Sequence, residues 1–270
     1  MKRGSHRDAN GFPMAPSQEE WDAMTPEEQA RVVVSLPGEV TDAELSPPEG
    51  DRHFRGKVQA FDTLTGFFGR EGRRVYVASE LPIYYPKERR FAPDLLAVVD
   101  AQTYSRDKWV VSAEGKGLDF VLEVHVGGDR KKDAERNVER YGRLGIPEYF
   151  IYDAGRQKLW GYRLPRAGAR KYVALKPVKG RLVSERLGLE LQVDGEHLRF
   201  FAGDTPLLEC AELISELTQL AKKLRRRAKK RALSLKETEQ RLEEERRRRE
   251  EAEHQLRGAQ AELARLKRRA

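Results

Sequence analysis

Short apolar runs separated by turn residues fill the middle of the chain. Six of them have the alternation or the bounded length that is typical of strands. They are RRVYVASE (73–80), DLLAVVD (94–100), KWVVSAE (108–114), DFVLEVHV (119–126), YFIYD (149–153) and KLWGYRL (158–164). We expect most of these runs to pair into one mixed sheet, and the weaker alternation over residues 163–206 predicts further hairpins.

Helical patterns precede and interrupt these strands. The stretch GKVQAFDTLTGFF (56–68) predicts one amphipathic helix, because its larger apolar residues recur at helical spacing: Val58, Phe61, Leu64, Phe67 and Phe68. Closer to the start, Ser17 and Glu20 form a capping box that predicts a helix within residues 17–36.

A further helix is predicted between the fourth and fifth strands, in GGDRKKDAERNVERYGRLGIPE (127–148). Asp129 is its candidate N-cap, and Gly145 with Pro147 marks its end. The order helix, strands, helix, strands predicts an α/β or α+β fold in which helices flank a central mixed β-sheet.

The last part of the chain follows one heptad register. Alternate steps of four and three residues from Cys210 to Ala270 meet eighteen positions, of which fourteen are apolar. This pattern predicts a long C-terminal coiled-coil helix and a homo-oligomer, such as a dimer, formed through residues 210–270. A solvated single helix held by ion pairs at i,i+4 is the alternative, and the mixture of Leu and Ala leaves the oligomeric order open.

Composition divides the chain into three segments. Residues 1–50 are rich in Pro, Gly, Ser and Glu and predict a flexible lead with a short helix. Residues 51–206 hold the strand and helix pattern of a folded domain, and residues 207–270 form a basic coiled-coil tail.

Charge is concentrated in the tail. The chain has a net charge of +8, and residues 209–270 hold 19 Lys and Arg against 12 Asp and Glu, which leaves the rest of the chain near neutral. The run KKLRRRAKKR (222–231) has the charge to contact nucleic-acid phosphates, although it equally suits the outer face of a coiled coil. No aromatic residue interleaves with it to stack on bases.

The cellular setting follows from what the sequence lacks. No run of about 18 apolar residues and no secretory h-region is present, so we expect no membrane span and a cytoplasmic protein. A single cysteine excludes an internal disulfide framework and a CxxC-type zinc site.

Candidate chemistry appears in the fourth strand, FVLEVHV (120–126). Glu123 and His125 project from one face of this strand, and a solvent-exposed face would explain them simply. However, FAPDLLAVVD places Pro93 and Asp94 at the start of another apolar strand, so two carboxylates can converge on one hard cation. Mg²⁺ takes such oxygen ligands, and a metal that activates water suits phosphodiester hydrolysis.

These elements resemble a known family. Pro93-Asp94, then Glu123-Val124-His125, then GDRKKDAERNVERYGRLGIPEYFIYD (128–153) look like the Uma-two family of restriction endonucleases, within the PD-(D/E)xK nuclease superfamily. The resemblance covers residues 18–206. It implies a restriction-endonuclease-like core, a DNA substrate, and Mg²⁺ or Mn²⁺ held by Asp94 and Glu123.

The chain departs from the family pattern at the catalytic lysine. His125 stands where the superfamily has lysine, and Asn137 stands where many relatives place it, four residues before Tyr141. Helix geometry makes Lys131 the first replacement and Arg130 the second, because about 100° per residue turns Lys131 toward the sheet. His125 is the other catalytic candidate, as a hydrogen-bond donor or proton acceptor.

Two functions are consistent with this pattern. The first is a metal-dependent DNA endonuclease whose tail brings two domains together. The second is a catalytically impaired relative that acts as a DNA- or protein-binding module. We expect three further histidines to be surface residues, namely His53, His197 and His254.

Overall fold

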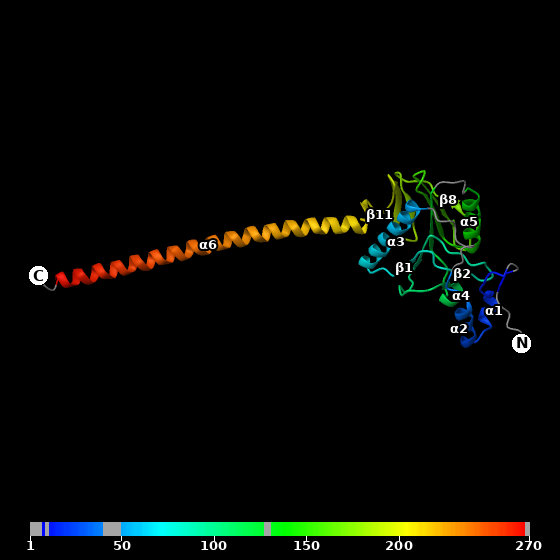
Figure 1. Cartoon of the computed structure of the whole chain (residues 1–270), viewed down its shortest axis with the longest axis horizontal. Helices are drawn as coiled ribbons and strands as arrows, with labels where there is room; N and C mark the ends of the chain where they lie inside the picture. Colours follow the sequence, from blue (N-terminus) through cyan, green and yellow to red (C-terminus); the bar gives the residue numbers. More distant parts are fainter. Residues whose placement is uncertain (1–6, 9–10, 40–49, 127–130, 268–270) are drawn as a thin grey trace. The chain divides into compact units, whose positions relative to one another are not determined.

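The computed structural model describes residues 7–8, 11–39, 50–126 and 131–267, and the side chains at 131–134 and 262–267 are not included in that description. The chain separates into two compact units, Met1–Cys210 and Ala211–Ala270. Figure 1 labels the elements of both units.

A six-stranded mixed sheet forms the centre of the first unit (Figure 1). Its strands lie in the order β1 (Val75–Ala78), β3 (Leu95–Val99), β5 (Phe120–His125), β6 (Glu148–Asp153), β7 (Lys158–Arg163) and β8 (Val173–Ala174). The β5–β6 pair is parallel, and α5 (Lys131–Leu144) is the crossover that a parallel pair requires. The predicted mixed sheet with flanking helices is confirmed.

One face of this sheet packs against the long helix α3 (Asp51–Glu71) and a second sheet. The second sheet is antiparallel and contains β9 (Leu182–Ser184), β10 (Leu189–Asp194), β11 (His197–Ala202) and β12 (Thr205–Pro206), which confirms the predicted hairpins. Side chains from α3 and both sheets make one apolar core, including Leu64, Phe68, Leu122, Phe150 and Phe200.

The other face of the sheet packs against α5. A second core joins Tyr141 of α5 to residues whose side chains alternate with those of the first core, including Leu96, Val121, Tyr149 and Ile151. The central strands are thus buried on both faces. A charged side chain in these strands therefore lies among packed residues. The free-energy cost of burying its charge must be offset by a partner.

The α3 helix approaches β5 closely at Gly56. A Cβ atom at this position would lie 3.0 Å from Cγ1 of Val124, so glycine permits the contact. The helix confirms the prediction for residues 56–68 but begins five residues earlier, and the side chain of Val58 is exposed rather than part of the core. This early start places an additional turn of helix beside the sheet.

Two predictions of local structure are wrong. The run KWVVSAE forms a two-residue strand, β4 (Trp109–Val110), which pairs with β2 (Ile83–Tyr84) and continues as the short helix α4 (Val111–Glu114). The segment 17–36 contains two helices, because Thr25 caps a second one whose first residue is a proline.

The two N-terminal helices are α1 (Gln18–Asp22) and α2 (Pro26–Ser35), and the predicted capping box of Ser17 and Glu20 is confirmed. The predicted end of α5 is also confirmed, since Gly145 follows it with a φ of +81°. The predicted N-cap Asp129 lies outside the described residues.

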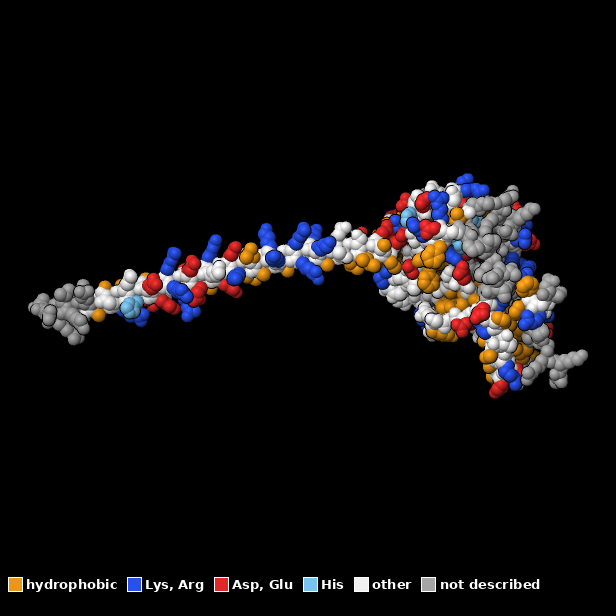
Figure 2. All heavy atoms as spheres, in the orientation of Figure 1, with side chains coloured by type: hydrophobic (Ala, Val, Ile, Leu, Met, Phe, Trp, Pro, Cys, Tyr) orange, Lys and Arg blue, Asp and Glu red, His pale blue; other side chains and the backbone are white. Residues whose placement is uncertain are grey.

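The second unit is one continuous helix, α6 (Cys210–Lys267). Apolar side chains recur along it between charged ones (Figure 2). Those at the predicted seam are exposed in the single chain, namely Ile214, Leu217, Leu224, Leu235, Leu242 and Leu256. Within the described ranges, no helix is both long and apolar enough to cross a bilayer.

Candidate active site

The two carboxylates predicted from the sequence lie together between neighbouring strands. Asp94 directly precedes β3 and Glu123 lies in β5, and the two strands are antiparallel with Leu95 opposite Leu122. The backbone N–H of Asp94 donates to Oε2 of Glu123 at 3.3 Å. The N–H of Val124 donates to Oδ2 of Asp94 at 2.8 Å. Each carboxylate thus accepts a backbone hydrogen bond from the strand of the other.

The two carboxyl groups differ in acidity. Burial, reinforced by the charge of Asp94, raises the pKa of Glu123 well above its ordinary value. Burial acts in the same direction on Asp94, but a hydrogen bond and the charge of His53, together with the Val124 N–H, lower the pKa of Asp94. Two carboxylates this close do not both ionise easily, and the opposite directions of their pKa shifts make Glu123 the carboxyl that takes up a proton first.

Glu123 is held from the α5 side by a buried tyrosine. The hydroxyl of Tyr141 donates to Oε1 of Glu123 at 2.8 Å. Its ring is fixed by Phe91 and Tyr149, whose centroids lie 5.3 and 4.9 Å from that of Tyr141. Tyr141 thus lies on the side of α5 that faces the sheet.

Asp94 is held from the opposite side by α3. Nε2 of His53 lies 3.1 Å from Oδ1 of Asp94, and only 13% of the histidine side chain is exposed. The expectation that His53 is a surface residue is therefore wrong. The apolar pattern begins the helix at Gly56, and this histidine lies in the preceding turn, one turn before Lys57. Its contact with Asp94 depends on tertiary packing.

Of the other predicted catalytic candidates, only His125 has a side chain that the structure describes. His125 is partly buried, two residues beyond Glu123 on the same face of β5, and pairs in register with Asp153. Lys131 is the first residue of α5, but its side chain lies outside the described residues, as does all of Arg130.

Asn137, at the position where relatives carry lysine, lies beside the phenol of Tyr149. Burial and the charge of Glu123 raise the pKa of Tyr149 well above its ordinary value, and the nearby side chain of Asn137 opposes that rise without forming a well-aligned hydrogen bond to the Tyr149 hydroxyl. Tyr149 thus lies near enough to both Asn137 and Glu123 for each to affect its pKa.

The donors at the site suit a hard divalent cation. In the part of the chain that the structure describes, no group of three or more His, Cys, Asp and Glu side chains is arranged to hold a metal. Two carboxylates nevertheless fit Mg²⁺ or Mn²⁺, which keep bound waters and take phosphate oxygens from a substrate. The raised pKa of Glu123 fits this assignment, because a cation would replace the proton that the pair shares.

Comparisons with known proteins identify the family of the chain. Curated proteins give no match. Among solved structures, the chain is similar to a "putative nuclease belonging to DUF820" from Anabaena variabilis, with 11% identity and a TM-score of 0.46 over 62% of this chain and 95% of that one. The family model Uma2, described as "Putative restriction endonuclease", matches residues 19–194, which is more than half of the chain. The chain therefore belongs to the Uma2 family.

Proposed function

We propose that the protein is a metal-dependent endonuclease that hydrolyses phosphodiester bonds in DNA, with Asp94 and Glu123 as ligands of Mg²⁺ or Mn²⁺. One observation carries this proposal, namely the carboxyl pair held between two strands that are buried on both faces. Such a pair costs stability unless a proton or a cation compensates its charge. Membership of a nuclease family supports the same conclusion.

The bound cation would lower the pKa of a water molecule and offset the negative charge that develops on the phosphoryl group. The residues of the chain orient the two ligands. Tyr141 fixes one oxygen of Glu123, and His53 fixes one oxygen of Asp94. Hydrolysis joins the water oxygen to phosphorus and breaks the bond to the leaving oxygen, while the water loses a proton and the leaving oxygen gains one. His125 and Lys131 are the candidates for orienting that water.

A cleavage assay tests the proposal. Supercoiled plasmid and single-stranded DNA are incubated with the full chain in Mg²⁺ and in Mn²⁺ separately. Replacing a ligand, in Glu123→Gln or Asp94→Asn, is expected to lower the cleavage rate on the order of 100-fold or more. Glu71→Gln is the matched control, because Glu71 is an exposed glutamate at the last residue of α3. Cleavage by Glu123→Gln at the wild-type rate would contradict the assignment.

We further propose that residues 51–206 are the nuclease domain and that residues 207–270 pair two chains as a coiled coil. The row of exposed apolar side chains on α6 supports this pairing, since a second helix would cover it. A dimer would bring two active sites to one duplex, one for each strand. The basic stretch 222–231 would then add contacts to phosphates.

A second function is favoured by the residues at the usual lysine positions, His125 and Asn137. A site without a catalytic cation would bind DNA or a protein partner without cutting. This alternative predicts that folded wild-type protein retards DNA in a gel but leaves plasmid intact in either metal. Cleavage that is lost in Glu123→Gln excludes it.

A further inference from the structure

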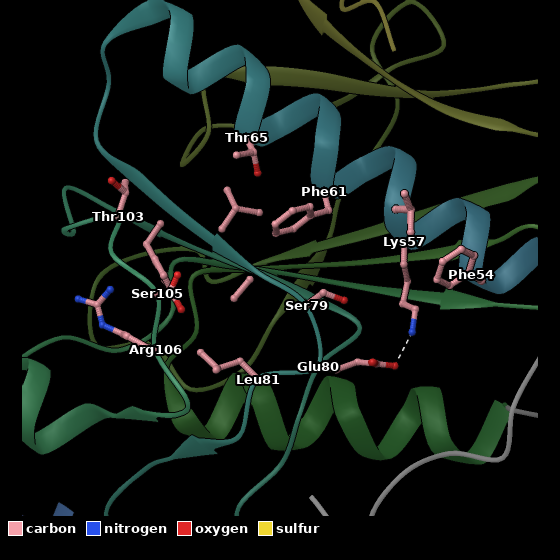
Figure 3. Close-up of a pocket in the computed structure, with 14 residues that line it drawn as sticks. Phe54, Lys57, Phe61, Thr65, Ser79, Glu80, Leu81, Thr103, Ser105 and Arg106 are labelled. Carbon is pink, nitrogen blue, oxygen red and sulfur yellow. Dashed lines mark hydrogen bonds and ion pairs between the residues drawn. The ribbon is translucent and has the colours of Figure 1, made fainter. Parts of the chain in front are cut away.

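A lysine that the sequence pattern did not single out lies on α3, one turn from the histidine that contacts Asp94. Lys57 is on α3, one turn after His53, and only 8% of the residue is exposed. Its ammonium group forms an ion pair with Glu80, toward which it extends from the helix in Figure 3. A lysine buried to this degree is uncommon without a partner or a function.

The partner of Lys57 adjoins the backbone that carries Asp94. The N–H of Glu80 donates to the carbonyl oxygen of Pro93 at 3.0 Å, and the hydroxyl of Ser79 donates to the carbonyl oxygen of Asp94 at 2.7 Å. The backbone of Glu80 has a φ of +53°, a left-handed conformation that is uncommon for residues other than glycine. The segment 79–80 thus places the Lys57–Glu80 pair next to the Pro-Asp element.

This pair also faces open space. A groove of about 490 Å³ runs between α3 and the segment after β1, and both Lys57 and Glu80 line it. Figure 3 shows Phe54 and Phe61 of the helix on the same side of the groove as Lys57. The side chain of Glu80 is 54% exposed, so it can swing into solvent while Lys57 stays in place. An anion that enters the groove can therefore replace the glutamate.

We infer that Lys57 is the phosphate-binding cation of this nuclease, exchanging Glu80 for a non-bridging oxygen of the DNA phosphate next to the carboxylate pair. This inference rests on the proposed function and names a cation that the usual lysine positions, now His125 and Asn137, do not supply. Lys57 takes no part in a covalent step. Its charge offsets the negative charge of the phosphate as the P–O bond to the leaving oxygen breaks.

Opposite effects at the two partners distinguish this role from a structural ion pair. Lys57→Met removes the cation and is expected to lower kcat on the order of 100-fold and to weaken DNA binding. Glu80→Gln removes the competing carboxylate and is expected to tighten DNA binding several-fold. A purely structural pair would instead weaken folding in both variants without tightening binding in either. Lys57→Arg retains the charge and is expected to restore part of the activity.

Binding is measured by fluorescence anisotropy of a labelled duplex with the full chain in Ca²⁺, across a series of salt concentrations. One lost phosphate contact reduces the slope of log affinity against log salt by about 0.9. We expect this reduction in Lys57→Met and not in Glu80→Gln. Thermal unfolding of each variant verifies that it is folded, and Lys131→Met serves as the comparison at the lysine predicted from the sequence.

The outcomes separate this inference from the proposed function. If the wild type cleaves and Lys57→Met cleaves at the same rate, Lys57 is not the phosphate-binding cation but the nuclease assignment stands. If the wild type does not cleave in Mg²⁺ or Mn²⁺, the proposed function fails. The binding series then decides alone, and an unchanged affinity and salt slope in Lys57→Met overturns the inference.

Discussion

Nε2 of His53 lies 3.1 Å from Oδ1 of Asp94. This contact connects α3 to the carboxylate that directly precedes β3. The second carboxylate oxygen of Asp94 accepts the N–H of Val124. The two contacts leave this carboxylate little freedom to rotate. A residue that orients a metal ligand in this way changes metal affinity or activity by about 10- to 100-fold when it is removed.

We therefore expect His53→Ala to weaken Mn²⁺ binding by about 10-fold or more. His53→Gln should be affected less, because an amide can still donate a hydrogen bond to Asp94. Isothermal titration of the full chain with Mn²⁺ measures both affinities. His254→Ala, on the exposed surface of α6, is the control. Equal affinities in His53→Ala and the control would show that the histidine has no part in holding the site.

Tyr141 influences the ionisation of Glu123. Its hydrogen bond lowers the pKa of that carboxyl, against burial and the charge of Asp94, which raise it. Tyr141→Phe should therefore raise the pKa of Glu123 further, and the acidic limb of the pH profile of kcat/KM should move to higher pH. The lost hydrogen bond should also lower the free energy of unfolding by about 0.5–1.5 kcal/mol.

Tyr104→Phe is the matched control for this variant, since Tyr104 is an exposed tyrosine that loses the same hydroxyl. Its pH profile and unfolding free energy should match those of the wild type. A Tyr141→Phe profile that superimposes on the wild-type profile would contradict the proposed role of the hydroxyl.

The ionisation of the carboxyl pair should make the stability of the metal-free protein depend on pH. The pKa of Glu123 is raised in the folded state, so its contribution to stability is complete below its unfolded pKa and is lost as the pH rises toward the folded value. Asp94, whose pKa is lowered, contributes above its unfolded pKa and loses that contribution only in acid.

The glutamine side chain in Glu123→Gln is neutral at every pH. This variant therefore does not lose stability at position 123 as the pH rises. In metal-free buffer, the Tm of Glu123→Gln minus that of the wild type should increase by a few degrees between about pH 5 and about pH 8. Thermal unfolding with a chelator present measures this difference. A difference that does not change with pH would show that Glu123 is not protonated more readily in the folded state.

Two leucines on α6 offer a paired test of the coiled coil. Leu235 lies at a seam position and Leu233 does not. The two are nevertheless equally accessible in the single chain, since Leu235 is 64% exposed and Leu233 is 60% exposed. Leu235→Asp should weaken self-association by about 10-fold or more, because a charge at a seam position must be buried on pairing. Leu233→Asp should leave association unchanged.

Sedimentation equilibrium reads this result directly, since the chain has a mass of 31.0 kDa and a dimer has twice that mass. Wild-type protein that sediments at the mass of one chain at all concentrations would contradict the dimer. Equal weakening by both substitutions would show that the apolar seam does not set the interface.

Much of the fold could be predicted from the sequence, because long elements carry a strong periodic signal. The strands β1, β3, β5, β6 and β7 of the central sheet and the helix α5 have enough residues for their pattern to be recognised. The strands β2 and β4 contain two residues each, too few for any period, and their pairing is a tertiary event. Segment 108–114 therefore has the sequence pattern of one strand, although the structure divides it into β4 and α4.

Some residues of the candidate site could likewise be predicted from the sequence, and others could not. Asp94 and Glu123 could be found because a carboxylate stands out within an apolar strand. His53 and Lys57 could not, since charged and polar residues are expected throughout the exposed side of a helix. Only the packing of α3 on the sheet shows which of them face inward.

The glycine at position 56 links this packing to the chemistry. A methyl group added there would lie 3.0 Å from Val124, so even alanine would require α3 or its neighbour to shift. Because His53 and Lys57 lie on either side of Gly56, any such shift would move both side chains at once. The small size of Gly56 thus sets the alignment of α3 with the carboxylates, and Gly56→Ala would displace both side chains without altering either Asp94 or Glu123.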